Sequence, residues 1–160
     1  MFEPELHARS PIERVIFTSP PTEIAQLRIQ SGVLYLAGYS ALHKFFPVAM
    51  LEERIQPALL LSQFVYYTDA FGVPAAFSSW AWLSSAVLQD VLETSRELRA
   101  DEYNCGDLPF FCEMIAPFGH CQTVVGDLGV MPCFEGRRIP FIRSKLSGDR
   151  LRVRVGYLRF

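Results

Sequence analysis

Apolar residues recur at helical spacing along several stretches, and three of these stretches begin at a residue suited to start a helix. Thr22 is a suitable N-cap, and Pro47 is tolerated at a first helical position. Pro57 is expected to stop the second helix, and a serine at 84 or 85 is expected to cap the third. The pattern therefore predicts helices over about 23–38, 47–55, 84–98 and 120–128.

Other segments are rich in strand-forming residues and are separated by turn-forming ones. Strands are expected at 59–68, 73–82, 109–116, 137–144 and 150–158. The last two form a closing hairpin in which Arg150, Arg152 and Arg154 point one way. Residues 1–19 have no clean period and are expected to form an irregular arm. We therefore predict one α/β (α+β) domain over residues 1–160, with a mostly antiparallel central sheet flanked by helices.

Composition narrows the functional classes. The chain has 160 residues and a formal net charge of −2, which argues against nucleic acid as a main partner because such a partner would require a basic face. No apolar run approaches the roughly 20 residues needed to cross a bilayer, so no transmembrane segment is expected. Glu3 and Glu5 stand where a signal peptide would be basic, and a cytoplasmic location is expected.

Four cysteines lie between positions 105 and 133. Their spacing matches no common zinc template, so we expect no metal site and reduced, packed thiols. Cys112 precedes Glu113 in a predicted strand, and strand alternation should place it on the opposite sheet face. A thiol nucleophile is therefore not expected beside Glu113.

Two polar residues stand out against apolar surroundings. His43 lies between apolar neighbours just before Pro47, and Glu113 is the lone carboxylate of an otherwise apolar strand. A buried carboxylate requires a partner, which is His43, Arg137 or another arginine. We predict that His43 and Glu113 meet across a cleft as a catalytic pair, because histidine is suited to proton transfer near neutral pH and a carboxylate can orient it.

Four blocks of sequence carry a resemblance to a known family. They are Ser40-x-x-His43-Lys-x-Phe-Pro47-Val48, Val73-Pro-Ala-Ala-Phe-Ser-Ser79-Trp80-Ala81, Asn104-Cys-Gly106-Asp107 and Ile115-Ala-Pro-Phe-Gly119. In this order and at about this spacing they resemble the toxin-activating lysine acyltransferases, cytoplasmic enzymes that activate RTX haemolysins and related protoxins. The resemblance covers roughly residues 30 to 160.

The resemblance implies an acetyltransferase-like (GNAT-type) fold and transfer of a fatty-acyl chain to the ε-amino group of a protein lysine. The donor it implies is acyl carrier protein, with no other cofactor, and family members commonly form homodimers. The family's essential histidine falls on His43, and its acidic residue, usually aspartate, falls on Glu113. Its serine near the histidine falls on Ser40, and its Ser-Trp pair falls on Ser79 and Trp80.

Further substrate contacts are expected where the third predicted strand ends. Phe118, Gly119 and His120 follow that strand, and free amides at the start of the next helix could receive an oxyanion or a phosphopantetheine phosphate. Two chemical routes remain open: His43 can act as a general base or as a nucleophile that accepts the acyl group. Two other functions also remain open, namely a non-catalytic module that binds an acyl carrier or partner, and a CoA-dependent acyltransferase acting on a small-peptide amine.

Overall fold

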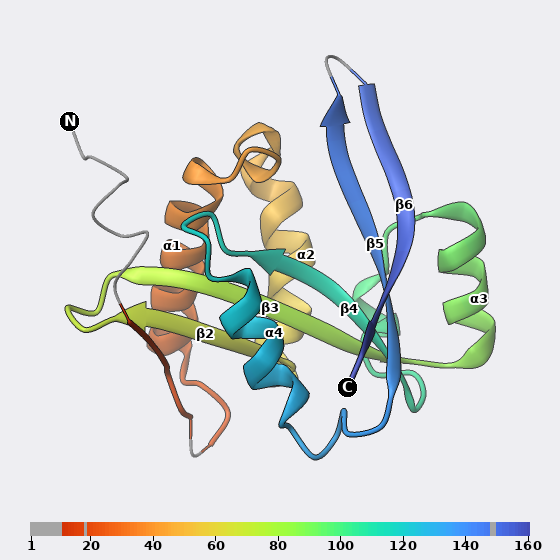
Figure 1. The fold of residues 1–160 in the computed structure, drawn as a ribbon, viewed down its shortest axis with the longest axis horizontal. Coiled ribbons are helices and arrows are strands. Elements are labelled where there is room, and N and C mark those ends of the chain that lie inside the picture. Colours follow the sequence, from red (N-terminus) through yellow and green to blue (C-terminus); the bar gives the residue numbers. More distant parts are fainter. Residues whose placement is uncertain (1–10, 18, 148–149) are drawn as a thin grey trace.

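The computed structural model describes residues 11–17, 19–147 and 150–160. Within these ranges it contains a six-stranded sheet, whose strands lie side by side in chain order, and four α-helices (Figure 1). The elements are β1 (Ile12–Arg14), α1 (Glu23–Tyr39), the 3₁₀ helix η2 (His43–Phe45), α2 (Val48–Leu60), β2 (Phe64–Asp69), β3 (Pro74–Leu83), α3 (Ser85–Thr94), the 3₁₀ helix η3 (Ala100–Glu102), β4 (Leu108–Ile115), α4 (Cys121–Gly129), β5 (Arg138–Ser147) and β6 (Arg150–Arg159).

Neighbouring strands pair antiparallel everywhere except between β4 and β5, which run parallel. These two strands share one register pair, Phe111 with Phe141, in the described part of the chain. Beyond that pair the carboxyl-terminal half of β4 has β3 as its only strand partner among the described residues. The mostly antiparallel sheet expected from the sequence is therefore confirmed, and one parallel contact joins the β5–β6 hairpin to the other four strands.

Helices cover both faces of the sheet, with α1 and α2 on one face and α4 on the other (Figure 1). Phe77 and Ile115 from the sheet pack against the inward side of α1 and α2. On the opposite face, the Trp80 and Phe111 side chains pack against α4 and against the Phe134 ring. Both layers exclude water from large apolar side chains, which is the main stabilising contribution in a domain of this size.

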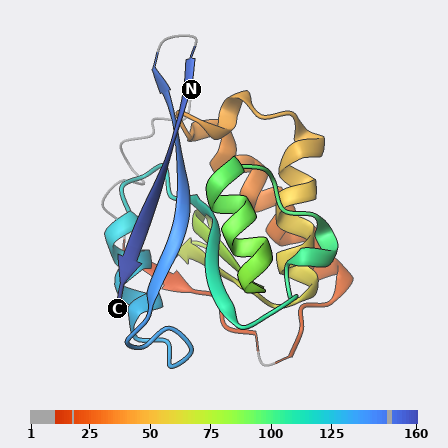
Figure 2. The same cartoon turned by 90° about the vertical axis from the view of Figure 1, so that its right-hand side faces the viewer.

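α3 lies at the end of the sheet beside the β5–β6 hairpin (Figure 2). It packs Val91 into a third apolar cluster that contains Ala58 of α2, Ala81 of β3 and Phe110 of β4. The Ser84 hydroxyl caps this helix by accepting from the Val87 amide, as expected from the sequence.

Some predicted boundaries are wrong, for local reasons. Pro57 does not stop α2, which continues to Leu60 because Ala58 and Leu59 are fully buried against the sheet. α3 ends at Thr94 rather than near Leu98, since Ser95 adopts a left-handed conformation (φ 56°). The segment expected to be an irregular arm contains the short strand β1, which pairs with β2; residues 1–10 of that arm lie outside the described residues.

A β-bulge interrupts the pairing of β3 with β4. Ser79 pairs with Glu113 and Trp80 pairs with Phe111, so Cys112 is an extra residue without a cross-strand partner. The predicted alternation of Cys112 and Glu113 is therefore wrong: Cys112 packs in the cluster beneath α2 and α3 rather than on the α4 face. In a regular strand Phe110 and Glu113, three residues apart, would face opposite sides of the sheet. The extra residue lets both face the side covered by the helices α2 and α3.

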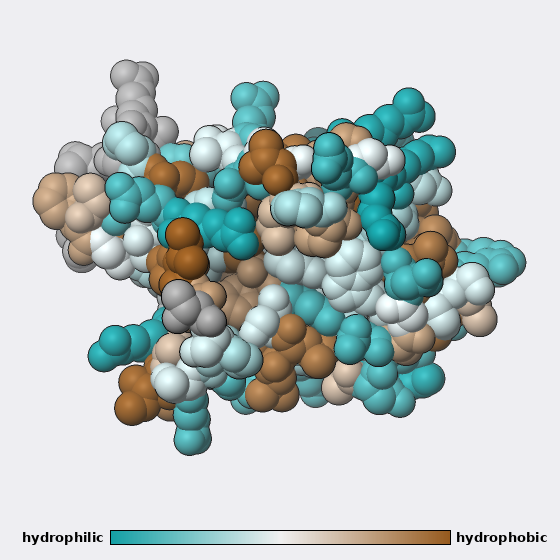
Figure 3. All heavy atoms as spheres, turned by 90° about the horizontal axis from the view of Figure 1, so that it is seen from below, coloured by the Kyte–Doolittle hydropathy of each residue, from teal (hydrophilic) through white to brown (hydrophobic). Residues whose placement is uncertain are grey.

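The outer surface is mixed in character. Seen from below, apolar side chains form separate patches between polar ones (Figure 3). Exposed apolar residues include Ile24 and Leu27 on the outer side of α1. Among the described residues, every helix falls short of the length and apolar character required to cross a membrane.

Candidate active site

Ser40 and His43 are positioned by the turn that follows α1. Ser40 is the C-cap of this helix, and its amide donates to the carbonyls of Leu36 and Ala37. The Ser40 hydroxyl oxygen also accepts from the His43 amide at 3.3 Å, which ties the start of η2 to the end of α1. This local hydrogen bond fixes the backbone from which the imidazole projects.

Both nitrogens of the His43 imidazole have side-chain partners. Nδ1 lies 2.6 Å from Ser40 Oγ, and Nε2 lies 3.0 Å from Glu113 Oε1. The histidine is 6% exposed and Glu113 is 8% exposed, so the contact is shielded from water. The structure thus brings together the two residues that the sequence singled out, along with the predicted Ser40.

Glu113 reaches His43 because of its place in the sheet. It pairs with Ser79, and cross-strand partners share a face, so both side chains point toward α1 and α2. The Ser78 hydroxyl donates to the Glu113 carbonyl at 2.9 Å and anchors the strand at this point. Ser79 Oγ is fully buried and has no hydrogen-bond partner among the described residues. An unpaired buried hydroxyl next to a catalytic candidate is available to a substrate group.

Arg54 of α2 contacts the second oxygen of Glu113. Its Nη1 lies 3.4 Å from Oε2, an ion pair that lacks hydrogen-bond geometry, while its Nε lies 3.1 Å from Glu97 Oε2. The Phe46 ring contacts both side chains that approach Glu113, with its centroid 5.3 Å from the His43 ring and 5.3 Å from the Arg54 guanidinium. Arg54 therefore shares Glu113 with His43 and is held in place from three directions.

Arg54 is not among the residues predicted for the site. The predicted alternative partner, Arg137, instead donates to the Asp107 carbonyl at 3.2 Å and stacks on Trp82. A signal for Arg54 was present, since it falls between the buried Leu51 and Ile55 on the inward side of α2. A charged residue on the apolar side of an amphipathic helix requires a buried partner.

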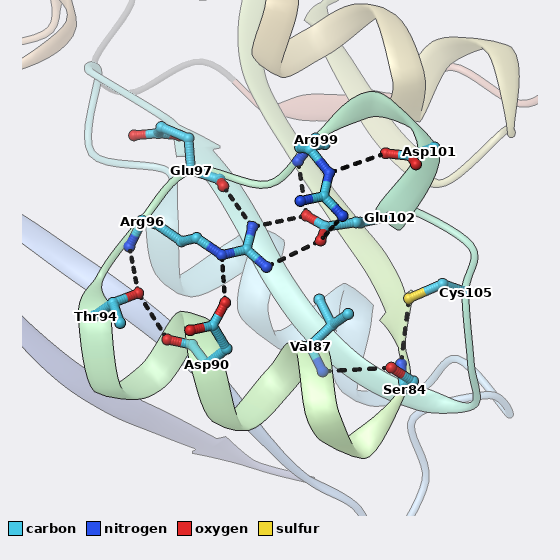
Figure 4. Close-up of polar contacts among 10 residues, drawn as sticks. All are labelled: Ser84, Val87, Asp90, Thr94, Arg96, Glu97, Arg99, Asp101, Glu102 and Cys105. Carbon is cyan, nitrogen blue, oxygen red and sulfur yellow. Dashed lines mark hydrogen bonds and ion pairs between the residues drawn. The ribbon is translucent and has the colours of Figure 1, made fainter.

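The loop that carries Glu97 is fixed by an ion-pair network (Figure 4). Arg96 binds both oxygens of the buried Glu102, at 2.8 and 2.9 Å, and its Nε donates to Asp90 at 2.5 Å. Arg96 also donates to the Glu97 carbonyl at 3.0 Å. Hydrogen bonds from Arg96 lower the pKa of Glu102 to about 2. The network fixes the segment between α3 and η3. It thereby positions Glu97, one of the two carboxylates that contact Arg54.

Two other ionisable side chains near the pair are kept neutral by burial. Burial raises the pKa of the Cys112 thiol well above its ordinary value, with the Glu113 charge adding to the effect. Burial also raises the pKa of the Tyr103 hydroxyl, which donates to the Arg54 carbonyl at 2.9 Å. A thiol with a raised pKa carries little thiolate, so Cys112 is a poor nucleophile even though it lies on the same side as Glu113.

The remaining predicted substrate contacts are divided between the two faces. Trp80 points away from the pair into the α4 layer, with its ring 5.2 Å from that of Phe134. Phe118 packs on the α1 side, 5.3 Å from the Tyr39 ring. Gly119 has a positive φ of 89°, which favours glycine, and it leads into His120, the N-cap of α4. His120 is 8% exposed, and its Nε2 has no hydrogen-bond partner among the described residues.

Two hollows flank this region. A cavity of about 100 Å³ lies between the segment after α3 and the strands β4, β5 and β6, and Arg54, Cys112, Ile142 and Val153 contribute to its lining. A larger groove of about 730 Å³ lies between α1, the β1 segment and the β2–β3 turn, lined mainly by apolar side chains such as Phe17, Leu27, Tyr35 and Pro74. The smaller cavity adjoins Arg54, whereas the larger groove includes neither His43 nor Glu113.

The four cysteines are free thiols spread over separate elements. Cys105 and Cys121 are exposed, contrary to the expectation of packed thiols, while Cys112 and Cys133 are half-buried. Among the described residues, no three His, Cys, Asp or Glu side chains are grouped as metal ligands would be.

Comparison with known proteins identifies the family to which the chain belongs. The family model described as the RTX toxin acyltransferase family matches residues 22–156. The lysine-acyltransferase RtxC of Vibrio cholerae is 36% identical over 137 residues, covering 82% of this chain and 90% of the relative. The leukotoxin-activating lysine-acyltransferase LtxC of Aggregatibacter actinomycetemcomitans is 38% identical over 88 residues, covering 55% and 52%. The protein-lysine myristoyltransferase HlyC of Escherichia coli is 34% identical over 93 residues, covering 58% and 53%.

The matched range contains every residue of the candidate site, from Ser40 to His120. The family model covers most of the chain, and the similarity to RtxC extends over nearly the whole of that relative. This chain is therefore an acyltransferase that belongs to the RTX toxin acyltransferase family.

Proposed function

We propose that this enzyme moves a fatty-acyl chain from the thioester of acyl carrier protein to the ε-amino group of a lysine in a protoxin or another protein or peptide. The observation that carries the proposal is the hydrogen-bonded chain from Ser40 through His43 to Glu113. Relatives named as lysine acyltransferases and as a protein-lysine myristoyltransferase support the acceptor and the fatty-acyl donor group. In this reading His43 is the base, Glu113 orients it, and Ser40 occupies its free nitrogen until the substrate arrives.

The proposed mechanism takes Glu113 as a carboxylate and His43 as a neutral imidazole. A carboxylate only accepts, so Nε2 carries the hydrogen that it donates to Glu113. Nδ1 is then the unprotonated nitrogen, and the Ser40 hydroxyl donates to it. The basic nitrogen of the proposed reaction is therefore Nδ1, on the side of the ring away from Glu113.

The proposed chemistry follows from that assignment. A lysine amine attacks the thioester carbon and passes a proton to Nδ1, while Glu113 stabilises the imidazolium that forms. The new carbon–nitrogen bond is made as the carbon–sulfur bond breaks, and the proton on His43 passes to the departing thiolate. The same unprotonated Nδ1 would be the attacking atom if His43 instead accepted the acyl group first.

We assign the other predicted residues to substrate binding. The start of α4 offers free amides, and Gly119 and the buried Nε2 of His120 adjoin them. These groups are suited to receive the thioester oxyanion or a phosphopantetheine phosphate. The free Ser79 hydroxyl beside Glu113 is suited to bind the incoming lysine or thioester, and Phe118 and Trp80 would line apolar parts of the site.

The fold supports an acetyltransferase-like (GNAT-type) reading. β4 and β5 run parallel and share one register pair before separating, with α4 as the crossover between them. A thioester chain could enter between the two strands, next to the cavity lined by Arg54 and Cys112. We further propose a cytoplasmic enzyme that can form a homodimer, since both properties accompany the toxin-activating enzymes that it resembles.

Intact-mass analysis tests the proposal directly. Candidate acceptor proteins, and an unrelated lysine peptide as a control, would be incubated with a panel of acyl carrier protein thioesters and either the wild type or His43→Ala. An acyl mass increment on lysine that depends on His43 is expected. Transfer from acyl-CoA to a small-peptide amine, but not from the carrier, would favour the CoA-dependent alternative. Intact thioester and unlabelled acceptors in every reaction would contradict transfer and favour a binding module.

A further inference from the structure

Like charges lie opposite one another along one face of the β5–β6 hairpin. The register pairs Arg143 with Arg154 and Lys145 with Arg152, and all four side chains are exposed. Because cross-strand partners share a face, the four cations lie together; we call them the basic face. Figures 1 and 2 show this part of the hairpin extending beyond the body of the molecule.

Among the described residues, no acidic side chain forms a salt bridge with the basic face. Every salt bridge formed by the described residues involves other cations, such as Arg54 and Arg96. Directly opposed like charges destabilise a hairpin, so this arrangement does not help the isolated protein to fold. The chain has 15 Lys and Arg residues and 17 Asp and Glu residues. Without the four cations of the basic face, the rest of the chain has 11 cations and 17 anions, a net charge of −6. The separation of charge is therefore strong although the total is small.

Protection of the sheet edge does not fully explain the pattern. β6 is an outer strand, and charged side chains on outer strands hinder pairing with other molecules. Charges of alternating sign would hinder such pairing equally and would also attract one another across the hairpin. A single sign on four facing residues is instead suited to a negatively charged partner.

The direction of the basic face indicates where such a partner would bind. By strand alternation it continues the face that carries Phe141 and Ile139. Ile139 packs with Phe111 and Phe134 in the layer covered by α4. The basic face therefore lies on the α4 side of the sheet, on the part of β5 that follows its one register pair with β4.

We propose that the basic face docks the acidic acyl carrier protein that delivers the thioester. This inference rests on the proposed function, because it identifies the surface through which the proposed donor binds. Residues two apart on one strand are separated by roughly 6.7 Å, and facing residues by about 5 Å. Acidic residues three or four apart on a helix have a similar spacing of about 5–6 Å, so an acidic helix can present carboxylates to both rows. A carrier bound here would direct its thioester chain toward the start of α4 and the gap beyond Phe111.

Charge reversal on β6 tests the docking surface. In the double variant Arg152→Glu/Arg154→Glu, each new carboxylate faces Lys145 or Arg143, so the hairpin gains opposite-charge pairs and the outer strand stays charged. Arg159→Glu, on the other face of the same strand, is the matched control. Affinity for fluorescently labelled acyl carrier protein is measured by anisotropy at low and high salt, and thermal unfolding checks that each variant is folded.

The double variant is expected to weaken carrier binding by about tenfold or more and to lose most of the salt dependence, while Arg159→Glu binds as the wild type does. The KM for the carrier should rise by a similar factor, with little change in kcat at saturation. Unchanged affinity in the double variant would overturn the docking proposal, and so would charge-dependent binding to phosphatidylglycerol vesicles without binding to the carrier. If the wild type binds the carrier through this face but labels no lysine, the docking surface stands and the proposed transferase function fails.

Discussion

Arg54 and Glu113 form an ion pair on the side of the carboxylate away from His43, with Nη1 3.4 Å from Oε2. The other oxygen of Glu113 remains for the imidazole, 3.0 Å away. One carboxylate is thus held between a permanent cation and a histidine, and its orientation depends on both. In the proposed mechanism Arg54 is a positioning residue, because it would act on the imidazole through Glu113.

Replacement of Arg54 should therefore impair turnover more than binding. We expect Arg54→Gln to lower kcat by roughly tenfold with little change in KM, because Glu113 loses one of its two anchors. Loss of the nearby positive charge should also favour the imidazolium, which moves the acidic limb of the pH–rate profile to higher pH. Arg54→Lys should recover part of the activity. A lower kcat with an unmoved pH profile would indicate that Arg54 has only a structural role.

Removal of the imidazole should abolish transfer. We expect His43→Ala to lower kcat by about 10²- to 10⁴-fold, the usual contribution of a positioned base. Lys44→Ala changes an adjacent exposed residue and serves as the matched control. Transfer would be followed by acceptor mass and folding by circular dichroism. Substantial transfer by folded His43→Ala would remove His43 from the mechanism.

Substitutions at Glu113 distinguish the effect of its charge from the effect of its side-chain length. Glu113→Gln retains the size of the side chain but removes its charge, so it no longer stabilises the imidazolium, and kcat should fall by about 10²-fold or more. Glu113→Asp retains the charge but shortens the side chain, which lengthens the 3.0 Å contact with His43; we expect an intermediate loss. Steady-state kinetics of both variants check this order. Greater activity in Gln than in Asp would contradict the role of the charge.

The Arg96–Glu102 network predicts a specific pH dependence of stability. The pKa of Glu102 is lowered to about 2, so its contribution is fully present above the ordinary carboxyl range and is lost as the pH falls toward 2. Glu102→Gln should destabilise the fold by roughly 1–2 kcal/mol near pH 7, because the partly exposed Arg96 loses a charged bidentate partner. Urea unfolding measures the difference, which should shrink as the pH is lowered from about 4.5 to 2. A constant difference over that range would show that the ionised carboxylate is not responsible.

Much of the fold could be predicted because local signals agreed with the tertiary structure. Thr22 and Ser84 cap their helices as expected, and Asp69 accepts from the amides of Phe71 and Val73 in the β2–β3 turn. The prediction around Pro57 was wrong because its local effect was weaker than burial of the residues that follow it. Sequence rules describe the local preference, whereas the length of α2 depends on packing against the sheet.

The candidate site was predictable in part for a similar reason. His43 and Glu113 stood out as polar residues in apolar surroundings, and their contact follows from that contrast. Arg54 was missed because its partner lies about 60 residues away in sequence, and helical spacing alone does not identify it. Gly106, from a sequence block shared with the family, packs so closely against the Leu83 backbone that a side chain would collide with it. That glycine is explained by packing rather than by chemistry.

The extra residue in β4 has a further consequence. After the extra residue, the odd-numbered side chains Glu113 and Ile115 point toward α1 and α2. Before the extra residue the alternation is the opposite, so the even-numbered Phe110 faces α2 and α3 while the odd-numbered Phe111 faces α4. Cys112 thus separates the half of the strand that carries the candidate site from the half that packs in the core. The two halves can therefore vary independently, because a change in one leaves the facing of the other intact.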